Sequence, residues 1–149
     1  MTIPIFAEEQ RPLSARERWV ARVAVTVARA ISVLPPSAIV RTLTVISRFS
    51  RPATAHQALS ARQAACTVSA RCAGQGCLQR SIAVVVLCRF EGSAPDWCTG
   101  FINRPFMAHA WVEVDGRAIG EPREIEDFTT VLAVRPHSRP KLQGRLKSR

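Results

Sequence analysis

An unbroken apolar run directly after a glycine-flanked cysteine constrains the fold of this chain more than any other feature. Cys77 follows Gly74 and Gly76, and every residue from Ile82 to Cys88 is apolar. Two glycines before such a run favour a sharp turn from a loop into a buried element. If that element is a helix, its first backbone amides and its dipole lower the pKa of the Cys77 thiol and can donate to an oxyanion.

The run itself fits two kinds of element. Val84, Val85 and Val86 are β-branched, as in a buried strand, whereas the length of the segment counted from Cys77 favours a buried helix. Periodicity alone does not separate the two. Further along, strands are predicted at Pro95 to Ile102, on both sides of Val114-Asp115-Gly116, and at Phe128 to Val134.

The turn at Val114-Asp115-Gly116 decides which residue faces His109. A three-residue loop closed by a left-handed glycine pairs His109 with Glu121, and this is the register we predict. A two-residue Asp-Gly loop would pair His109 with Pro122 and turn Glu121 to the opposite face. The first register brings together a cysteine, a histidine and a carboxylate that could act as nucleophile, base and orienting group.

Helices are predicted before this region, after an extended arm of about a dozen residues. Ser14 and Glu17 form a capping-box pattern, and Pro35-Pro36 ends the first helix. A second helix is predicted from Ser37 to about Arg48, and Thr54 can cap a third. Apolar residues at helical spacing in the first helix are Trp19, Val20, Val23, Val27, Ile31 and Leu34; those predicted to face inward in the second are Ile39, Leu43 and Ile46.

Two segments of this sequence resemble a known family. Cys77-Leu-x-Arg-Ser followed by an apolar segment, then Ala-His-Ala-Trp-Val-Glu-Val-Asp-Gly and a later carboxylate, look like the lasso-peptide leader peptidases, which are bacterial cysteine proteases with a transglutaminase-like core. The resemblance covers about residues 54–122. It implies an α+β, transglutaminase- or papain-like fold, with N-terminal helices and a catalytic helix packed on a small antiparallel sheet. It also implies Cys77 as nucleophile, His109 as base and Glu121 as the third member, where aspartate would be at least as common.

The resemblance also implies the reaction and its partners. The enzyme would remove the leader from a ribosomally made lasso-peptide precursor without a metal or another cofactor. A leader-binding domain fused ahead of the protease, found in some members, is not seen in this sequence, which fits a system with a separate leader-recognition protein and an ATP-dependent cyclase that takes the core. Two alternatives remain: another acyl-transfer enzyme on the same core, such as a transglutaminase or amidase, or a non-catalytic basic binding protein.

Several residues near the proposed triad are weaker candidates. Gln75 and Arg71 could donate to an oxyanion, and Trp111, on the His109 face of its strand, could shield the imidazole from water. Glu113 shares that face and competes with Glu121. The remaining cysteines and histidines are interpreted as structural or incidental: Cys66, Cys72, Cys88, Cys98, His56 and His137.

Composition limits the remaining classes of function. The net charge is +10, but no nucleic-acid-binding motif accompanies it, so we expect a solvated basic surface and no nucleic-acid partner. The five cysteines show no disulfide or zinc spacing, and no signal peptide is evident, which predicts a cytoplasmic protein. The longest apolar segment, Val20 to Leu34, contains two arginines and is too short for membrane insertion.

We expect one protease domain over residues 1–134, with helices at about 14–70, a catalytic core at about 71–134, and a basic, disordered tail at 135–149.

Overall fold

The structure is a computed structural model that describes residues 10–137 of the chain. It has five α-helices: α1 (Ala15–Ser32), α2 (Pro36–Ser47), α3 (Ala55–Val68), α4 (Ala70–Ala73) and α5 (Cys77–Phe90). A 3-10 helix, η1 (Arg123–Asp127), precedes the last strand. The six strands are β1 (Arg51–Pro52), β2 (Ser93–Ala94), β3 (Asp96–Asn103), β4 (Phe106–Val114), β5 (Arg117–Ala118) and β6 (Thr129–Val134).

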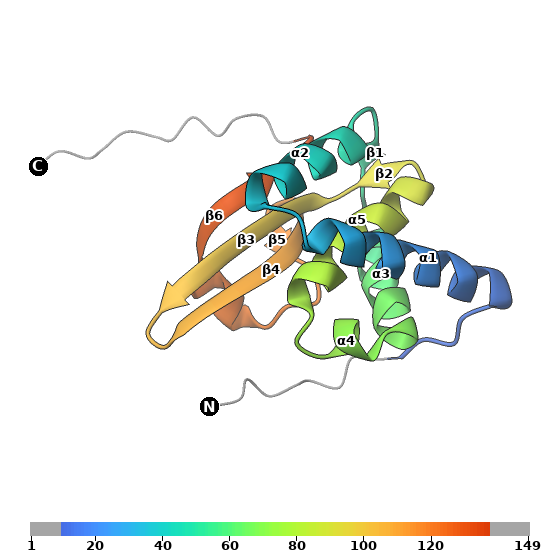
Figure 1. The fold of residues 1–149 in the computed structure, drawn as a ribbon, viewed down its shortest axis with the longest axis horizontal. Helices are drawn as coiled ribbons and strands as arrows, with labels where there is room; N and C mark the ends of the chain where they lie inside the picture. The colour runs from blue at the N-terminus through green and yellow to red at the C-terminus, as the bar shows by residue number, and fades with distance from the viewer. Residues whose placement is uncertain (1–9, 138–149) are drawn as a thin grey trace, which may run out of the picture.

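The apolar run after Cys77 forms helix α5, which lies at the centre of the molecule. Every residue from Gln79 to Cys88 in this helix is buried. It packs against α1 and α3 on one side and against β4 on the other. In Figure 1 the helices lie to one side of the sheet, and the β3–β4 hairpin extends away from them. The predicted α+β class, with helices and a catalytic-helix candidate on a small antiparallel sheet, is confirmed.

The N-terminal helices begin where the sequence predicted. Ser14 and Glu17 form the capping box of α1, and Thr54 and Gln57 form a second one on α3. The predicted apolar face of α1, however, is wrong for most of its members. Trp19 is 72% exposed, and Val23, Val27 and Leu34 are also exposed. The buried residues of α1 are Ala21, Ala24, Ala28 and Ile31. Small alanine side chains let α1 approach α5 closely, so the larger valines are left outside.

The main sheet has four antiparallel strands in the order β5-β4-β3-β6. β3 lies between β4 and β6, and the β3–β4 pairing runs the full length of β3, from Asp96 opposite Glu113 to Asn103 opposite Phe106. A separate parallel pair, β1 and β2, joins the segment after α2 to the segment after α5. The sheet therefore holds β4, which carries His109, across from the start of α5.

The predicted three-residue turn after β4 is wrong. Glu113 pairs with Ala118 and Val114 with Arg117, which leaves Asp115 and Gly116 as a two-residue loop. Both have positive φ, 52° and 77°, as a type I′ turn requires. The Asp-Gly pair suits that turn because aspartate tolerates and glycine freely adopts the left-handed region. The paired part of β5 is only two residues long, so the register does not extend to Glu121.

The described part of the C-terminal region is attached to the sheet. Arg135 was predicted to begin the disordered tail, but it contacts Glu113 at 2.8 Å and Asp96 at 3.4 Å. The rest of the predicted tail from residue 138 onward, like residues 1–9 of the predicted arm, lies outside the described residues.

Among residues 10–137, no helix is long and apolar enough to cross a membrane. The same residues contain no group of three His, Cys, Asp or Glu side chains placed to hold a metal ion.

Candidate active site

Cys77 is the first residue of α5, as the glycines before it predicted. Gly76 is the N-cap, and its carbonyl accepts the first helical hydrogen bond from the Arg80 backbone N–H at 2.8 Å. A Cβ at Gly76 would lie 2.6 Å from the carbonyl oxygen of Arg71, so only glycine allows this tight turn. The backbone N–H groups of Cys77 and the next two residues have no helical acceptor because they belong to the first turn. A helix start of this kind stabilises negative charge on the thiol.

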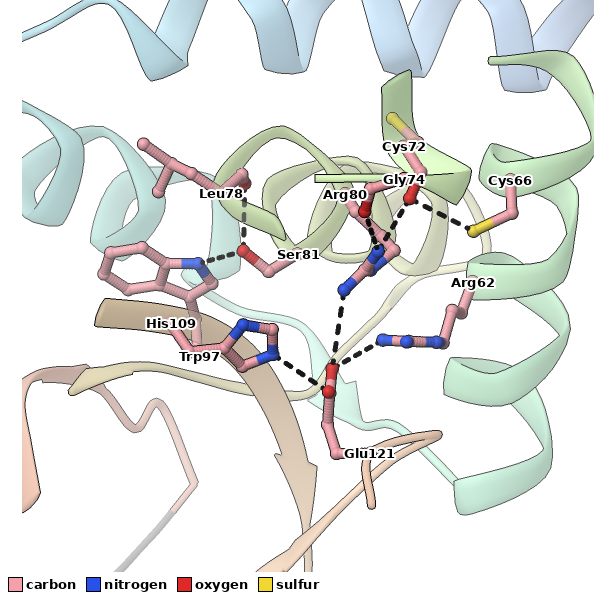
Figure 2. Close-up of polar contacts among 10 residues, drawn as sticks. All are labelled: Arg62, Cys66, Cys72, Gly74, Leu78, Arg80, Ser81, Trp97, His109 and Glu121. Atoms are coloured by element: carbon pink, nitrogen blue, oxygen red, sulfur yellow. Dashed lines mark hydrogen bonds and ion pairs between the residues drawn. The ribbon is translucent and has the colours of Figure 1, made fainter. Parts of the chain in front are cut away.

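His109 and Glu121 form a direct hydrogen bond. Nε2 of His109 lies 2.9 Å from Oε2 of Glu121. The Glu121 side chain is only 3% exposed and the His109 side chain 20%. In Figure 2, Nε2 of the ring points to Glu121 and the other ring nitrogen points toward α5. Because Nε2 is held by the carboxylate, Nδ1 is the ring nitrogen on the side of α5.

The pKa values of these groups reflect their mutual contact. Burial raises the pKa of the Cys77 thiol, but its hydrogen bond and charge interaction with His109, the backbone of Ala110 and the Arg80 charge lower it more, so the net change is downward from 9.0. Burial lowers the pKa of His109, yet hydrogen bonds to Cys77 and Glu121 raise it from 6.5 to about 9. The structure therefore favours a thiolate–imidazolium pair.

Two buried arginines, missed by the sequence analysis, hold Glu121 (Figure 2). Arg62 of α3 donates from Nη1 to Oε1 of Glu121 at 2.6 Å, and Arg80 of α5 lies 4.0 Å from the same oxygen. Both arginine side chains are 7% exposed. Burial raises the pKa of Glu121, whereas the bond to His109 and the charges of Arg62 and Arg80 lower it below 4.5 overall. The carboxylate thus stays ionised although it is buried.

Arg80 also fixes the loop that leads to Cys77. Its Nη1 donates to the carbonyl oxygens of Cys72 at 2.7 Å and Gly74 at 3.2 Å. One guanidinium group therefore connects the loop before the thiol to Glu121. The next residue, Ser81, accepts a hydrogen bond from the Trp97 indole at 3.0 Å and so joins α5 to β3. The sequence signal that could have identified Arg80 was its place in the Cys-Leu-x-Arg-Ser pattern, because a charged residue at the start of a buried helix needs a partner.

Aromatic side chains cover the imidazole. Trp111 is 2% exposed and stacks on His109 with ring centroids 6.3 Å apart and an interplanar angle of 11°. Phe128, which the sequence analysis did not single out, contacts both rings edge-on, at 6.1 and 6.2 Å. Glu113 accepts from the Trp111 indole at 2.9 Å and from Arg135 at 2.8 Å, so it does not compete for His109.

A cavity of about 350 Å³ opens beside Cys77 and His109. Its walls are largely apolar and include Leu78, Phe101, Phe106 and Ala108. Gln75 and Arg71, predicted as possible oxyanion donors, do not line it. Gln75 is exposed, and Arg71 lines a different cavity next to α1. Of the predicted oxyanion donors, the backbone N–H of Cys77 remains.

The arrangement agrees with comparisons to known proteins at the level of a family. Neither the comparison with curated proteins nor that with solved structures finds a match. Residues 21–133, which include Cys77, His109 and Glu121, match the Transglutaminase-like superfamily domain. Since this match spans most of the chain and the fold is the one expected for the domain, the chain belongs to the transglutaminase-like superfamily.

Proposed function

We propose that this chain is a cysteine peptidase that removes the leader from a ribosomally synthesised lasso-peptide precursor, together with a separate leader-recognition protein. The observation that carries the proposal is the contact chain from Cys77 through His109 to Glu121, with 2.9 Å between imidazole and carboxylate, at the mouth of an apolar cavity. The superfamily supports acyl-transfer chemistry through a cysteine. The leader and the partner come from the resemblance of the two motif segments to leader peptidases.

The proposed reaction begins with the Cys77 thiolate attacking a peptide carbonyl carbon. The carbonyl oxygen becomes an oxyanion, which the Cys77 backbone N–H at the start of α5 stabilises. Imidazolium His109 then donates its proton to the departing amine, the C–N bond breaks, and a thioester to Cys77 remains. Neutral His109 next takes a proton from water, whose oxygen attacks the thioester and releases the carboxylic acid.

The surrounding residues maintain this geometry. Glu121 keeps the Nε2 proton of His109 in place, so Nδ1 faces the sulfur. Arg62 and Arg80 keep Glu121 charged, and Trp111 and Phe128 restrict water at the ring. The apolar walls around Phe101, Phe106 and Ala108 suit an uncharged side chain of a polypeptide next to the cleaved bond.

The test is incubation of the purified chain with a precursor peptide and its leader-binding protein, followed by mass spectrometry. We expect cleavage at the leader–core junction by the native protein and none by Cys77→Ala. Cys88→Ala is the matched control because it removes a buried sulfur from the same helix away from the cavity. Cleavage by Cys77→Ala would contradict the mechanism. Attachment of an added primary amine to the acyl group, with little hydrolysis, would instead identify a transglutaminase.

A further inference from the structure

A second cavity of about 360 Å³ lies on a different part of the surface from the Cys77 site. Helix α1 contributes Arg22, Val25 and Arg29 to its walls, and the junction of α3 and α4 contributes Ser69 and Arg71. Gln79 of α5 also lines it. None of these residues lines the cavity at Cys77. The proposed catalytic mechanism therefore gives this second cavity no role.

Three arginines from two helices converge on this cavity without an acidic partner. Within residues 10–137, Arg22, Arg29 and Arg71 form no ion pair and no side-chain hydrogen bond, in contrast to Arg62, which is bound to Glu121. Like charges gathered around one hollow repel each other unless negative charge lies among them. Guanidinium groups bind carboxylate and phosphate oxygens with paired hydrogen bonds. The cavity is thus suited to an anionic ligand.

Gln79 indicates that the ligand is a polypeptide. Its side chain is nine-tenths buried or more, at 5% exposed, and its Nε2 donates to the carbonyl of Val25 at 3.0 Å. That bond fixes the orientation of the amide and leaves Oε1 buried without a hydrogen-bond partner. An acceptor oxygen of this kind needs a donor. Oε1 itself is closed to solvent, so a donor reaches it only when the Gln79 side chain turns toward the cavity. A peptide with acidic side chains suits both features, because its carboxylates meet the arginines and its backbone N–H groups can donate to the turned amide, whereas a fully ionised phosphate only accepts.

Exposed apolar side chains also lie on α1, on a neighbouring face of the helix. Trp19, Val23 and Val27 follow each other at four-residue spacing, and Trp19 lies three residues, about one helical turn, before Arg22. Trp19 is therefore a neighbour of Arg22 on the helix surface, although it does not line the cavity. Trp97 and Trp111 are 1% and 2% exposed, so Trp19 is the one indole of the chain open to contact with a bound molecule.

We propose that the cavity lined by Arg22, Arg29, Arg71 and Gln79 binds an acidic segment of another polypeptide. This site is separate from the reacting thiol and does not depend on the proposed peptidase activity. Arg71 is nevertheless connected to the loop before Cys77, because its carbonyl accepts the Gly76 N–H at 2.9 Å. A polypeptide held at this cavity would be anchored against the loop that leads into Cys77.

The test measures binding of a short oligoglutamate peptide, capped at both ends, to the full chain by calorimetry and by intrinsic tryptophan fluorescence. An oligoglutamine peptide is the neutral comparison. The double variant Arg22→Glu/Arg29→Glu should weaken oligoglutamate binding by roughly tenfold or more, since two charge-assisted contacts are reversed. Arg41→Glu/Arg117→Glu makes the same change in net charge at exposed positions outside the cavity and should weaken binding far less. Gln79→Met tests the amide without changing the charge and should also weaken binding.

Three results would overturn the proposal. Equal losses in the two double variants would show general attraction to a basic protein. Inorganic phosphate or a single-stranded oligonucleotide binding the cavity as tightly as oligoglutamate would show that the ligand is not a peptide. No binding of oligoglutamate by the correctly folded native chain would exclude the site. Measuring the same affinity in Cys77→Ala, and normal alkylation of Cys77 in the Arg22→Glu/Arg29→Glu variant, separates this outcome from failure of the proposed peptidase function.

Discussion

Replacing Glu121 by glutamine tests the proposed catalytic arrangement most directly. One oxygen of Glu121 accepts from Arg62 at 2.6 Å, and the other bonds Nε2 of His109 at 2.9 Å. Glutamine offers one acceptor oxygen, and arginine can only donate, so the amide oxygen should stay with Arg62 and the amide nitrogen should face His109. Nε2 must then accept, which places the ring proton on Nδ1. In that tautomer His109 cannot take the proton of Cys77.

The expected loss can be sized from the pKa of His109. Raising it from 6.5 to about 9 corresponds to roughly 3 kcal/mol in favour of the imidazolium, shared between Cys77 and Glu121. If Glu121→Gln removes about half of this free energy, His109 is less often charged near pH 7. Roughly tenfold less thiolate then forms, because the thiolate loses its charged partner. The wrong tautomer adds a larger penalty, since the corresponding change in a serine-protease triad lowers kcat about 10⁴-fold. We expect precursor cleavage to fall about 10³- to 10⁴-fold.

The assay combines precursor cleavage with the pH dependence of iodoacetamide alkylation. In Glu121→Gln the pKa of the Cys77 thiol should rise and alkylation near neutral pH should slow about tenfold. Glu113→Gln is the matched control: this carboxylate lies on the same strand as His109 but bonds Trp111 and Arg135. A native alkylation profile in a folded Glu121→Gln protein would refute the role of Glu121.

Three further predictions follow from the site. Iodoacetamide at neutral pH should label Cys77 and leave Cys98 unmodified, because burial raises the pKa of the Cys98 thiol to about 12; peptide mapping that finds Cys98 labelled in the folded protein would contradict this. The kcat/KM for cleavage should rise as pH increases and Cys77 ionises, then fall above about 9 as His109 loses the proton needed by the leaving amine; activity that keeps rising past that pH would oppose the assignment. Gly120→Ala should destabilise the protein by more than the 1–3 kcal/mol or so typical of a strained φ, and slow alkylation, because a Cβ there would lie 2.6 Å from Cδ of Arg62. Gly116→Ala has a similar φ but no atom within 4 Å of the added carbon. In a denaturant titration it should therefore lower the free energy of unfolding only by the cost of the strained φ.

Local patterns predicted the starts of the elements well. The capping boxes at Ser14 and Thr54 depend on a partner three residues away, and the backbone geometry at Cys77 depends on the glycine before it. Such signals lie within one turn of chain and need no knowledge of the tertiary fold. The helix at 77–90 required more, because its valine-rich run fits a strand equally well.

Tertiary packing decided what the sequence could not. Trp19 and Val23 have helical spacing and were expected in an apolar face, but α1 buries its alanines because they allow a close approach to α5. No local pattern in the sequence around Arg62 predicted its contact with Glu121. It is 59 residues from Glu121 in sequence, and its role depends on α3 lying beside the loop after β5. A buried ion pair of this kind is visible only once the helices and the sheet are assembled.

The contact between His109 and Glu121 forms for a different reason from the one the sequence suggested. The predicted ladder register is wrong, and continuing the observed two-residue register would have turned Glu121 away from His109. The last backbone hydrogen bond to β4 runs from the Ile119 N–H to the Val112 carbonyl at 3.0 Å, and Gly120 then adopts a φ of 69°, which bends the chain. The absence of a Cβ at Gly120 also lets Arg62 pass close to the backbone and reach the carboxylate. Glu121 is therefore positioned by a left-handed glycine and a buried ion pair, so substitutions in the Asp115–Gly116 turn should disturb the site far less than substitutions at Gly120 or Arg62.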